Sequence, residues 1–361
     1  MNTLEALVSL NLIPQIGSVR LENLLKYFLK PEAVFTASRK DLSSVVGEQI
    51  GESIATFDVK RLERDLALAK KLGLKIITLF DQEYPQVLKE IPGPPIVLYV
   101  LGNIACEDNL AIGIVGSRRA SLYGLSCAEK FAAELGAQGV TIVSGMARGV
   151  DTYAHRGALK VKGRTIAVIG SGFNHIYPPE NESLAKEISS SGAVISEFPM
   201  ETVPLPMNFP RRNRLISGLS LGVLITEAAR NSGALITADF ALEQGREVFA
   251  LPGRIDFNGS TGTNALLKQG AKMVTCCNDI LEELNLATTQ AKEPVDTIKK
   301  QEIACGKDEG LLYEHISNQA VSIDALVEKT ALPSSQILNL ILKLRFKKLI
   351  KELPGKQFMR N

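Results

Sequence analysis

Three glycine-rich loops carry the residues of this sequence whose types and spacing suit the binding of a phosphate. Each loop follows a short apolar segment: residues 116–119 (GSRR) follow AIGIV, residues 144–151 (SGMARGVD) follow VTIV, and residues 170–172 (GSG) follow TIAVI. Small residues let the backbone approach an anion closely, and the start of a following helix supplies partial positive charge. One such loop would be weak evidence, because sharp strand-to-helix turns need glycine anyway. Three together predict a phosphate-binding rim.

A run of arginines is the second chemical feature. Arg211, Arg212 and Arg214 lie within four residues, directly behind Phe209 in the segment NFPRRNRLI. Guanidinium groups match phosphate oxygens, and an exposed aromatic ring gives a base a surface on which to stack. With the loop arginines, this segment would form a positive groove. The alternative is structural: Phe209 is buried and each arginine pairs with a glutamate such as Glu197.

Common catalytic motifs are missing from the sequence. There is no GxGxxG fingerprint, no phosphate-binding loop ending in Gly-Lys-Ser/Thr, no GxSxG elbow and no HExxH spacing among the three histidines. Asp151 and Glu227 both follow apolar segments and could form a carboxylate pair. Alternatively, Asp151 caps its helix or holds Arg148 in place. We predict a protein that is not an enzyme and that uses no cofactor and no metal.

The loops and the arginine run are expected at one edge of a sheet. Residues 74–284 alternate short Ile- and Val-rich segments with helical patterns. This alternation predicts an α/β domain with an extended Rossmann-like, doubly wound, mostly parallel sheet. Ligands of such a sheet bind beyond the carboxyl ends of its strands, where all these loops would lie.

Helical patterns flank this domain on both sides. Residues 1–73 contain two apolar-glycine turns, Ile13–Ser18 and Val45–Gly47, typical of a SAM-like (helix-hairpin-helix) domain that either contacts DNA or only packs. Residues 285–304 are polar and predict a linker. Residues 305–361 show three helical patterns and a terminal hairpin, which predict a winged-helix domain. That domain could contact duplex DNA or another protein.

Composition limits the partners. The chain has 361 residues, and Lys+Arg 41 against Asp+Glu 39 gives a net charge of +2, which excludes a generally sticky polycation but allows a confined groove. No apolar run is long enough to span a membrane, and no secretory signal is evident, so we expect no membrane partner. The five cysteines form no CxxC pair, which indicates reduced thiols and a cytoplasmic location.

Several segments together resemble one known family. In order along the chain they are PPIVLYVLG, IVGSRRAS, SGMARGVDTYAH, GSGFNHIYPPEN, NFPRRNRLISGLS, SGALITADFALEQGREVFALPG and GTNALLKQGA. These segments resemble the bacterial DNA-processing protein A family (DprA/Smf). One departure is Pro179, which stands where many members of that family carry lysine.

The resemblance implies a recombination mediator. Such proteins bind incoming single-stranded DNA during natural transformation, protect it, and load the RecA recombinase over single-strand-binding protein. They form homodimers through the central domain, and no catalytic turnover is attributed to them. The residues that we expect to bind DNA are Gly116, Ser117, Arg118, Arg119, Ser144, Gly145, Arg148, Gly149, Asp151, Gly170, Gly172, Phe209, Arg211, Arg212, Asn213 and Arg214.

A rival hypothesis is a nucleotide-binding or nucleotide-cleaving enzyme of the wider Rossmann-like group. Enzymes of that group that cleave nucleoside monophosphates carry a Pro-Gly-Gly loop followed by a catalytic glutamate. Here Pro252-Gly253 is followed by Arg254, which weakens the hypothesis.

Overall fold

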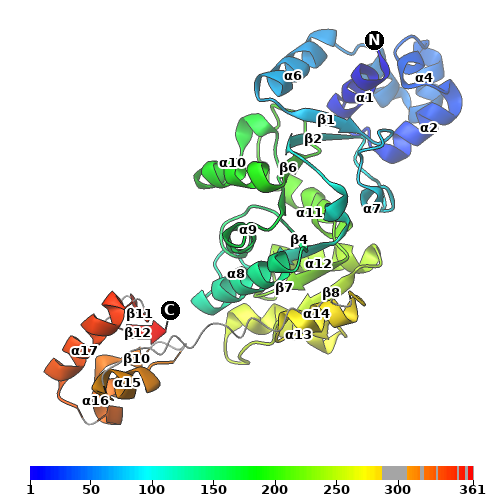
Figure 1. Ribbon diagram of the computed structural model, residues 1–361. Helices are drawn as coiled ribbons and strands as arrows, with labels where there is room; N and C mark the ends of the chain where they lie inside the picture. Colours follow the sequence, from blue (N-terminus) through cyan, green and yellow to red (C-terminus); the bar gives the residue numbers. More distant parts are fainter. Residues whose placement is uncertain (287–306, 318–320, 331, 348, 354–356, 361) are drawn as a thin grey trace. The chain divides into compact units, whose positions relative to one another are not determined.

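A computed structural model (Figure 1) describes residues 1–286, 307–317, 321–330, 332–347, 349–353 and 357–360. By its internal contacts the chain divides into two compact units, residues 1–287 and 288–361, which are described separately below. The predicted linker at 285–304 lies outside the described residues except for its first two positions. No helix in the described ranges is long and apolar enough to cross a membrane.

The first unit is built on one nine-stranded sheet within residues 1–286. Its strands are β1 (Lys75–Thr78), β2 (Val97–Gly102), β3 (Ala111–Val115), β4 (Thr141–Ser144), β5 (Thr165–Val168), β6 (Ala193–Ser196), β7 (Gly222–Ile225), β8 (Glu247–Ala250) and β9 (Lys272–Met273). They lie in the order β1-β2-β6-β5-β4-β3-β7-β8-β9. From β6 to β9 all neighbours pair in parallel, whereas β2 pairs antiparallel with both β1 and β6.

Helices cover both faces of the sheet (Figure 1). Those of this unit are α1 (Thr3–Leu12), α2 (Ser18–Phe28), α3 (Pro31–Val34), α4 (Arg39–Val46), α5 (Glu48–Ala55), α6 (Val59–Lys71), α7 (Gln86–Lys89), α8 (Leu122–Ala137), α9 (Val150–Lys160), α10 (Glu182–Ser191), α11 (Asn208–Gly218), α12 (Gly233–Glu243), α13 (Thr261–Lys268) and α14 (Cys277–Glu283). Single turns of 3-10 helix are η1 (Cys106–Asn109), η2 (Phe173–His175), η3 (Pro179–Asn181) and η4 (Asn258–Ser260).

The core follows from the alternation of side chains along each strand. Successive residues of a strand point to opposite faces, so in β7 Val223 and Ile225 pack with α11 and α12, while Leu224 packs with α8, α9 and α14. Strands that are buried on both faces must be apolar at every position, which is why the segments were visible in the sequence. The predicted doubly wound, mostly parallel sheet is confirmed.

The chain reverses its direction of winding between β3 and β7. From β3 it adds β4, β5 and β6 on one side, and it then returns to place β7, β8 and β9 on the other side. The loops after β3 and β7 therefore diverge and leave a crevice at the carboxyl edge. Ligands of open α/β sheets bind at such a switch point.

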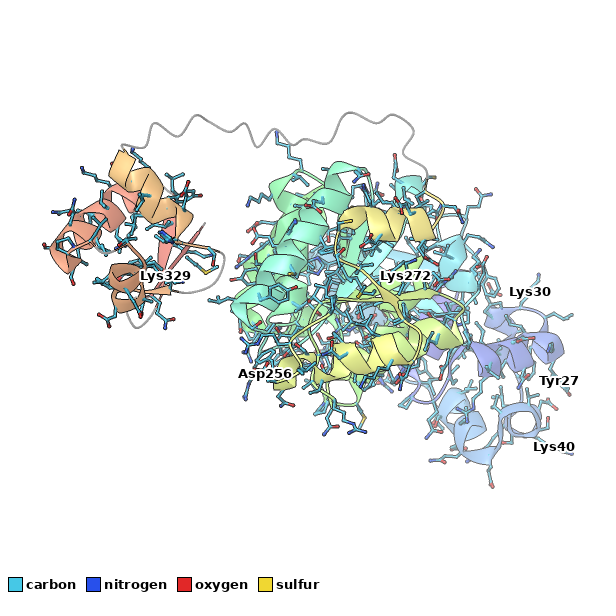
Figure 2. All side chains as sticks on the ribbon, turned by 90° about the horizontal axis from the view of Figure 1, so that it is seen from below. Tyr27, Lys30, Lys40, Asp256, Lys272 and Lys329 are labelled. Atoms are coloured by element: carbon cyan, nitrogen blue, oxygen red, sulfur yellow. The ribbon has the colours of Figure 1, made fainter. Side chains whose placement is uncertain are left out.

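The helices that precede β1 are joined to the sheet by a buried carboxylate. Asp65 of α6 accepts a hydrogen bond from the Tyr99 hydroxyl of β2 at 2.6 Å and another from the Met200 amide at 2.8 Å. Both Asp65 and Tyr99 are buried. Burial raises the pKa of Asp65, and the two hydrogen bonds oppose that shift. The outer surface of these helices carries exposed side chains, among them Tyr27, Lys30 and Lys40 (Figure 2).

The second unit has the elements that the sequence predicts for a winged helix. They are α15 (Lys307–Glu314), α16 (Ile323–Thr330), α17 (Ser334–Phe346), β10 (Val321–Ser322), β11 (Ile350–Leu353) and β12 (Gln357–Arg360). The hairpin β11–β12 is antiparallel, and β12 also pairs with β10. On α17, Ile337, Leu340, Ile341 and Leu344 are buried on one face, as their spacing indicates.

The link between α6 and the sheet predicts a ranked pair of mutational effects. Tyr99→Phe leaves a buried carboxylate oxygen of Asp65 without its donor, so we expect the free energy of unfolding to fall by about 1–3 kcal/mol. Tyr84→Phe is the matched control, because its buried hydroxyl donates to a neutral carbonyl, that of Pro95, at 2.9 Å. We expect that change to cost about 1 kcal/mol. Urea titrations followed by circular dichroism measure both, and a smaller cost for Tyr99→Phe would contradict the assignment.

Candidate nucleic-acid interface

A cavity of about 660 Å³ lies at the switch point. Its walls come from the loop after β3, the loop after β4, the first turns of α11 and the start of α12. Because α8, α9 and α12 all begin at this edge, their first-turn amides add partial positive charge to it. The structure thus brings together the first two glycine-rich loops and part of the arginine run.

The first loop is held by its backbone, which leaves its arginines free. The Ser117 amide donates to the Glu227 carbonyl at 2.7 Å, and a Cβ atom on Gly116 would lie 2.6 Å from the Val150 side chain. Arg118 and Arg119 are exposed, and no carboxylate among residues 1–286 forms an ion pair with either. Two unpaired guanidinium groups therefore stand at the mouth of the cavity.

The second loop is held by hydrogen bonds to the buried side chain of Asp151. This buried carboxylate accepts hydrogen bonds from the amides of Gly145 at 3.1 Å and Ala147 at 3.3 Å. Ser144 is also buried, and its hydroxyl donates to the Ile114 carbonyl at 2.6 Å. Gly149 has a φ of 77°, and a Cβ there would clash with the Ser117 carbonyl, so glycine is required. Ser144, Gly149 and Asp151 are thus placed to hold the loop.

The two carboxylates that could form a catalytic pair are both occupied. Asp151 collects the amides of its own loop, and Glu227 accepts the Ser121 amide at 3.0 Å together with the Ser121 hydroxyl, at the start of α8. The partner of Arg148 is Glu180, not Asp151.

An aromatic pair lies beside the free arginines. The ring of Phe209 is half-buried, and its centroid lies 5.8 Å from that of Tyr177, with a tilt of 55° between the planes. The guanidinium carbon of Arg118 is 4.9 Å from the Phe209 centroid, and that of Arg148 is 5.9 Å from the Tyr177 centroid. A Cβ on Gly170 would come within 3.0 Å of Phe209, which explains the glycine in the third loop. The cluster combines two rings with two cations.

Tyr177 was not among the residues predicted to bind DNA. The available signal was its place in the segment IYPPEN, directly after the third glycine-rich loop. Gly172, which was among them, is buried and does not line the cavity, and a Cβ there would clash with the carbonyl oxygens of Pro199 and Met200. Asn213 lines the cavity and donates to the Gly233 carbonyl at 3.3 Å, at the start of α12.

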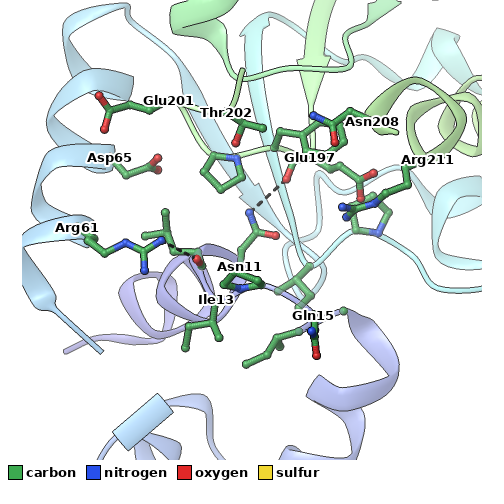
Figure 3. A pocket seen from close by; sticks show the side chains of 18 of the residues that line it. Asn11, Ile13, Gln15, Arg61, Asp65, Glu197, Glu201, Thr202, Asn208 and Arg211 are labelled. Atoms are coloured by element: carbon green, nitrogen blue, oxygen red, sulfur yellow. Dashed lines mark hydrogen bonds between the residues drawn. The ribbon is translucent and has the colours of Figure 1, made fainter. Parts of the chain in front are cut away.

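Helical periodicity divides the arginines of α11 between two faces. Phe209, Arg212 and Asn213 lie on the face toward the cavity, whereas Arg211 and Arg214 lie on another face and line a second cavity (Figure 3). Arg214 pairs with the buried Glu197 and donates to the Gly93 carbonyl at 2.8 Å.

Arg212 is buried beneath the loops, with an exposed fraction of 4%. Its guanidinium donates to the carbonyls of Gly145 and Val168, at the carboxyl ends of β4 and β5, and to the Asn213 side chain at 3.2 Å. Burial lowers the pKa of Arg212 to about 10, a shift that the charge of Asp151 opposes. Burial likewise raises the pKa of Asp151, against the attraction of Arg212. Arg212 is therefore placed to hold the loops.

Comparison with known proteins identifies the family. The sequence model of the DNA recombination-mediator protein A family matches residues 75–285. The chain belongs to this family. A DprA winged-helix domain matches residues 300–356.

Individual members agree with this assignment. The chain is 37% identical to Protein Smf of Escherichia coli, covering 90% of this chain and 89% of that protein. It is 39% identical to DNA processing protein DprA of Bacillus subtilis, covering 78% of this chain and 97% of that protein. Among solved structures, DprA of Streptococcus pneumoniae superposes with a TM-score of 0.69 at 34% identity, covering 78% of this chain and 99% of that one. A Helicobacter pylori DprA structure that concerns single-stranded DNA binding gives a TM-score of 0.54 at 32% identity, covering 60% of this chain and 98% of that one.

Removing the buried guanidinium should destabilise the fold. Arg212→Ala removes a donor from the Gly145 and Val168 carbonyls and leaves Asp151 without this neighbouring cation, so we expect the free energy of unfolding to fall by about 3–5 kcal/mol. Arg118→Ala is the matched control, because that side chain is exposed, and its midpoint of urea unfolding should stay unchanged. Equal midpoints for the two variants would show that Arg212 has no structural role.

His155 of α9 predicts a pH dependence of stability. It is fully buried, its Nδ1 lies 2.7 Å from the Thr165 hydroxyl, and burial lowers its pKa from 6.5 to about 3. Between these values the unfolded chain binds more protons than the folded one. The free energy of unfolding should therefore fall with decreasing pH by up to about 1.4 kcal/mol per unit. Urea titrations across this pH range measure how the free energy of unfolding depends on pH. This dependence should be shallower for His155→Asn than for the wild type. For the control His175→Asn, at an exposed histidine, it should equal that of the wild type. A wild-type slope in both variants would contradict the prediction.

Proposed function

We propose that the cavity at the switch point binds single-stranded DNA without reading its sequence. The carrying observation is the cluster in which the unpaired Arg118 stands over Phe209, with Tyr177 and Arg148 beside it. Guanidinium groups and loop amides bind phosphates of any sequence, and aromatic rings stack on any base. The relative from Helicobacter pylori, whose structure concerns single-stranded DNA binding, supports the proposal.

The proposed site has an outer and an inner part. Gly116, Ser117, Arg118, Arg119, Arg148, Phe209 and Tyr177 contact the strand, whereas Ser144, Gly145, Gly149, Asp151, Gly170 and Arg212 hold the loops in place. Asn213 orients the start of α12. The proposed role is binding, and it is supported by Asp151 and Glu227, which both accept hydrogen bonds from backbone amides.

Within its family, we propose that the chain acts as a recombination mediator in the cytoplasm. It would protect incoming DNA during natural transformation and load RecA over single-strand-binding protein. We further propose a homodimer through the central domain, which would cover the edge strand β9. Met273 of this strand is 55% exposed, and its neighbour Lys272 can be found in Figure 2.

The winged helix is proposed as a contact for duplex DNA or protein. Two of its basic side chains are already paired, Arg345 with Glu352 and Lys347 with Glu309. Lys348, the next basic residue along the chain, lies outside the described residues.

Fluorescence anisotropy with labelled oligothymidine tests the proposed binding. Arg118→Ala should weaken affinity about tenfold, the value of one charged contact. It should also make the log–log salt slope shallower by about 0.7, the value of one phosphate. Phe209→Leu should weaken binding by about 1–3 kcal/mol with little change in that slope, because stacking releases no counterions.

The control is Arg39→Ala, which removes an exposed arginine of α4 that pairs with Glu52. It should bind as the wild type does. Binding that is insensitive to salt, or unaffected by Arg118→Ala and Phe209→Leu together, would refute the proposed site.

A further inference from the structure

A second cavity, of about 720 Å³, lies on the other side of α11. Figure 3 shows its walls: Asn11, Ile13 and Gln15 at the end of α1 and in the following turn, Arg61 and Asp65 on α6, and Arg211 on α11. The cavity thus lies between the N-terminal helices and the sheet. Two contacts join its walls: the hydrogen bond between Asp65 and Tyr99, and that of the Asn11 side chain, which donates to the Glu197 carbonyl at 3.2 Å.

Five cations and four carboxylates line this cavity, but they are not equally available. Each carboxylate is engaged within the protein: Asp58 accepts the Lys60 amide, Asp65 accepts the Tyr99 hydroxyl, Glu197 pairs with Arg214, and Glu201 pairs with Arg64. Lys60, Arg61 and Arg211 form no ion pair with a carboxylate among residues 1–286, although the charge of Arg211 acts on Glu197. Over the whole lining the five cations exceed the four carboxylates by one, so the cavity has a small excess of positive charge.

Contacts within the protein orient two of these three cations. The guanidinium carbon of the exposed Arg211 lies 5.2 Å from the centroid of the buried Phe198 ring, and Arg61 donates to the Leu12 carbonyl at 3.1 Å, so both side chains are oriented. Gly17 lines the same cavity, and α2 begins there without a side-chain cap. Its first-turn amides have no intrahelical acceptors and add to the positive potential.

One helix separates this cavity from the one at the switch point. Phe209 and Arg212 face the first cavity and Arg211 faces the second, and an α-helix with its side chains is about 10–12 Å across. Arg211 lies in the first turns of α11, beside Phe209. A polyanion bound over Phe209 can therefore pass over this end of the helix into the second cavity.

We propose that this second cavity is a second contact site for the same DNA strand, in which Arg211, Lys60 and Arg61 bind backbone phosphates. The proposal rests on single-stranded DNA binding at the switch point. It gives the turn at residues 13–18 a role in binding the strand, and it extends the footprint of the strand from the sheet onto the N-terminal helices. It also accounts for Arg211, which is exposed and unpaired yet faces away from the first cavity.

Strand length provides the test, because a short oligonucleotide can fill only one site. We would measure the anisotropy of labelled oligothymidines of about 4 and about 16 nucleotides, the range of site sizes in proteins that bind single strands. Arg211→Ala should weaken binding of the long strand about tenfold and make its salt slope shallower by about 0.7, while the short strand binds as to wild type. Lys60→Ala, at an exposed side chain, should act in the same direction.

The controls separate this inference from the proposed function. Arg118→Ala should weaken both lengths, and Arg39→Ala should weaken neither. If Arg118→Ala weakens both lengths but Arg211→Ala and Lys60→Ala weaken neither, the second site is refuted and the first stands. Equal losses for both lengths in Arg211→Ala would place Arg211 in the first site and also refute the inference. If Arg118→Ala changes nothing, the proposed function itself fails.

Discussion

The buried guanidinium of Arg212 is the interaction on which the binding edge depends. Parallel strands end with carbonyl groups that must find donors, and the chain here turns sharply after both β4 and β5. One planar group with five N–H donors meets this need for Gly145 and Val168 at once. Asp151 complements it by accepting the amides of the same loop and by lying close enough to offset the charge. The loop between β4 and α9 is thereby held from below.

Because buried groups support the loops, the exposed side chains of the loops remain available to a ligand. Because Arg212 and Asp151 satisfy the inner backbone groups, the loops need no surface side chain for their own support. Arg118 and Arg119 are exposed and form no ion pair within residues 1–286, and Phe209 and Tyr177 are half-buried. The cost of burying a charge near the loops is offset by hydrogen bonds, as buried charges require. What results is an edge suited to phosphates and bases of any sequence.

The junction with the N-terminal helices extends the same logic. Tyr99 is a strand residue that reaches across to α6 and finds a carboxylate there, so the helices are positioned by a buried polar contact as well as by apolar packing. A polar contact has a defined geometry, whereas apolar packing alone tolerates sliding. Both cavities share α11 as a wall, and so the arginine run serves two faces.

The fold class, the three glycine-rich loops and their common edge follow from the sequence alone, because buried parallel strands must be apolar throughout and because glycine marks close backbone approach. The sequence also placed Phe209 and Arg118 in one region. It did not determine β9, which is only two residues long, nor that Tyr177 lies beside Phe209. Only the tertiary structure separated Arg212 from Arg211 and Arg214. Their adjacency in sequence suggests one cluster, but a helix turns about 100° per residue, and burial then decides which guanidinium supports the loops and which ones face a cavity.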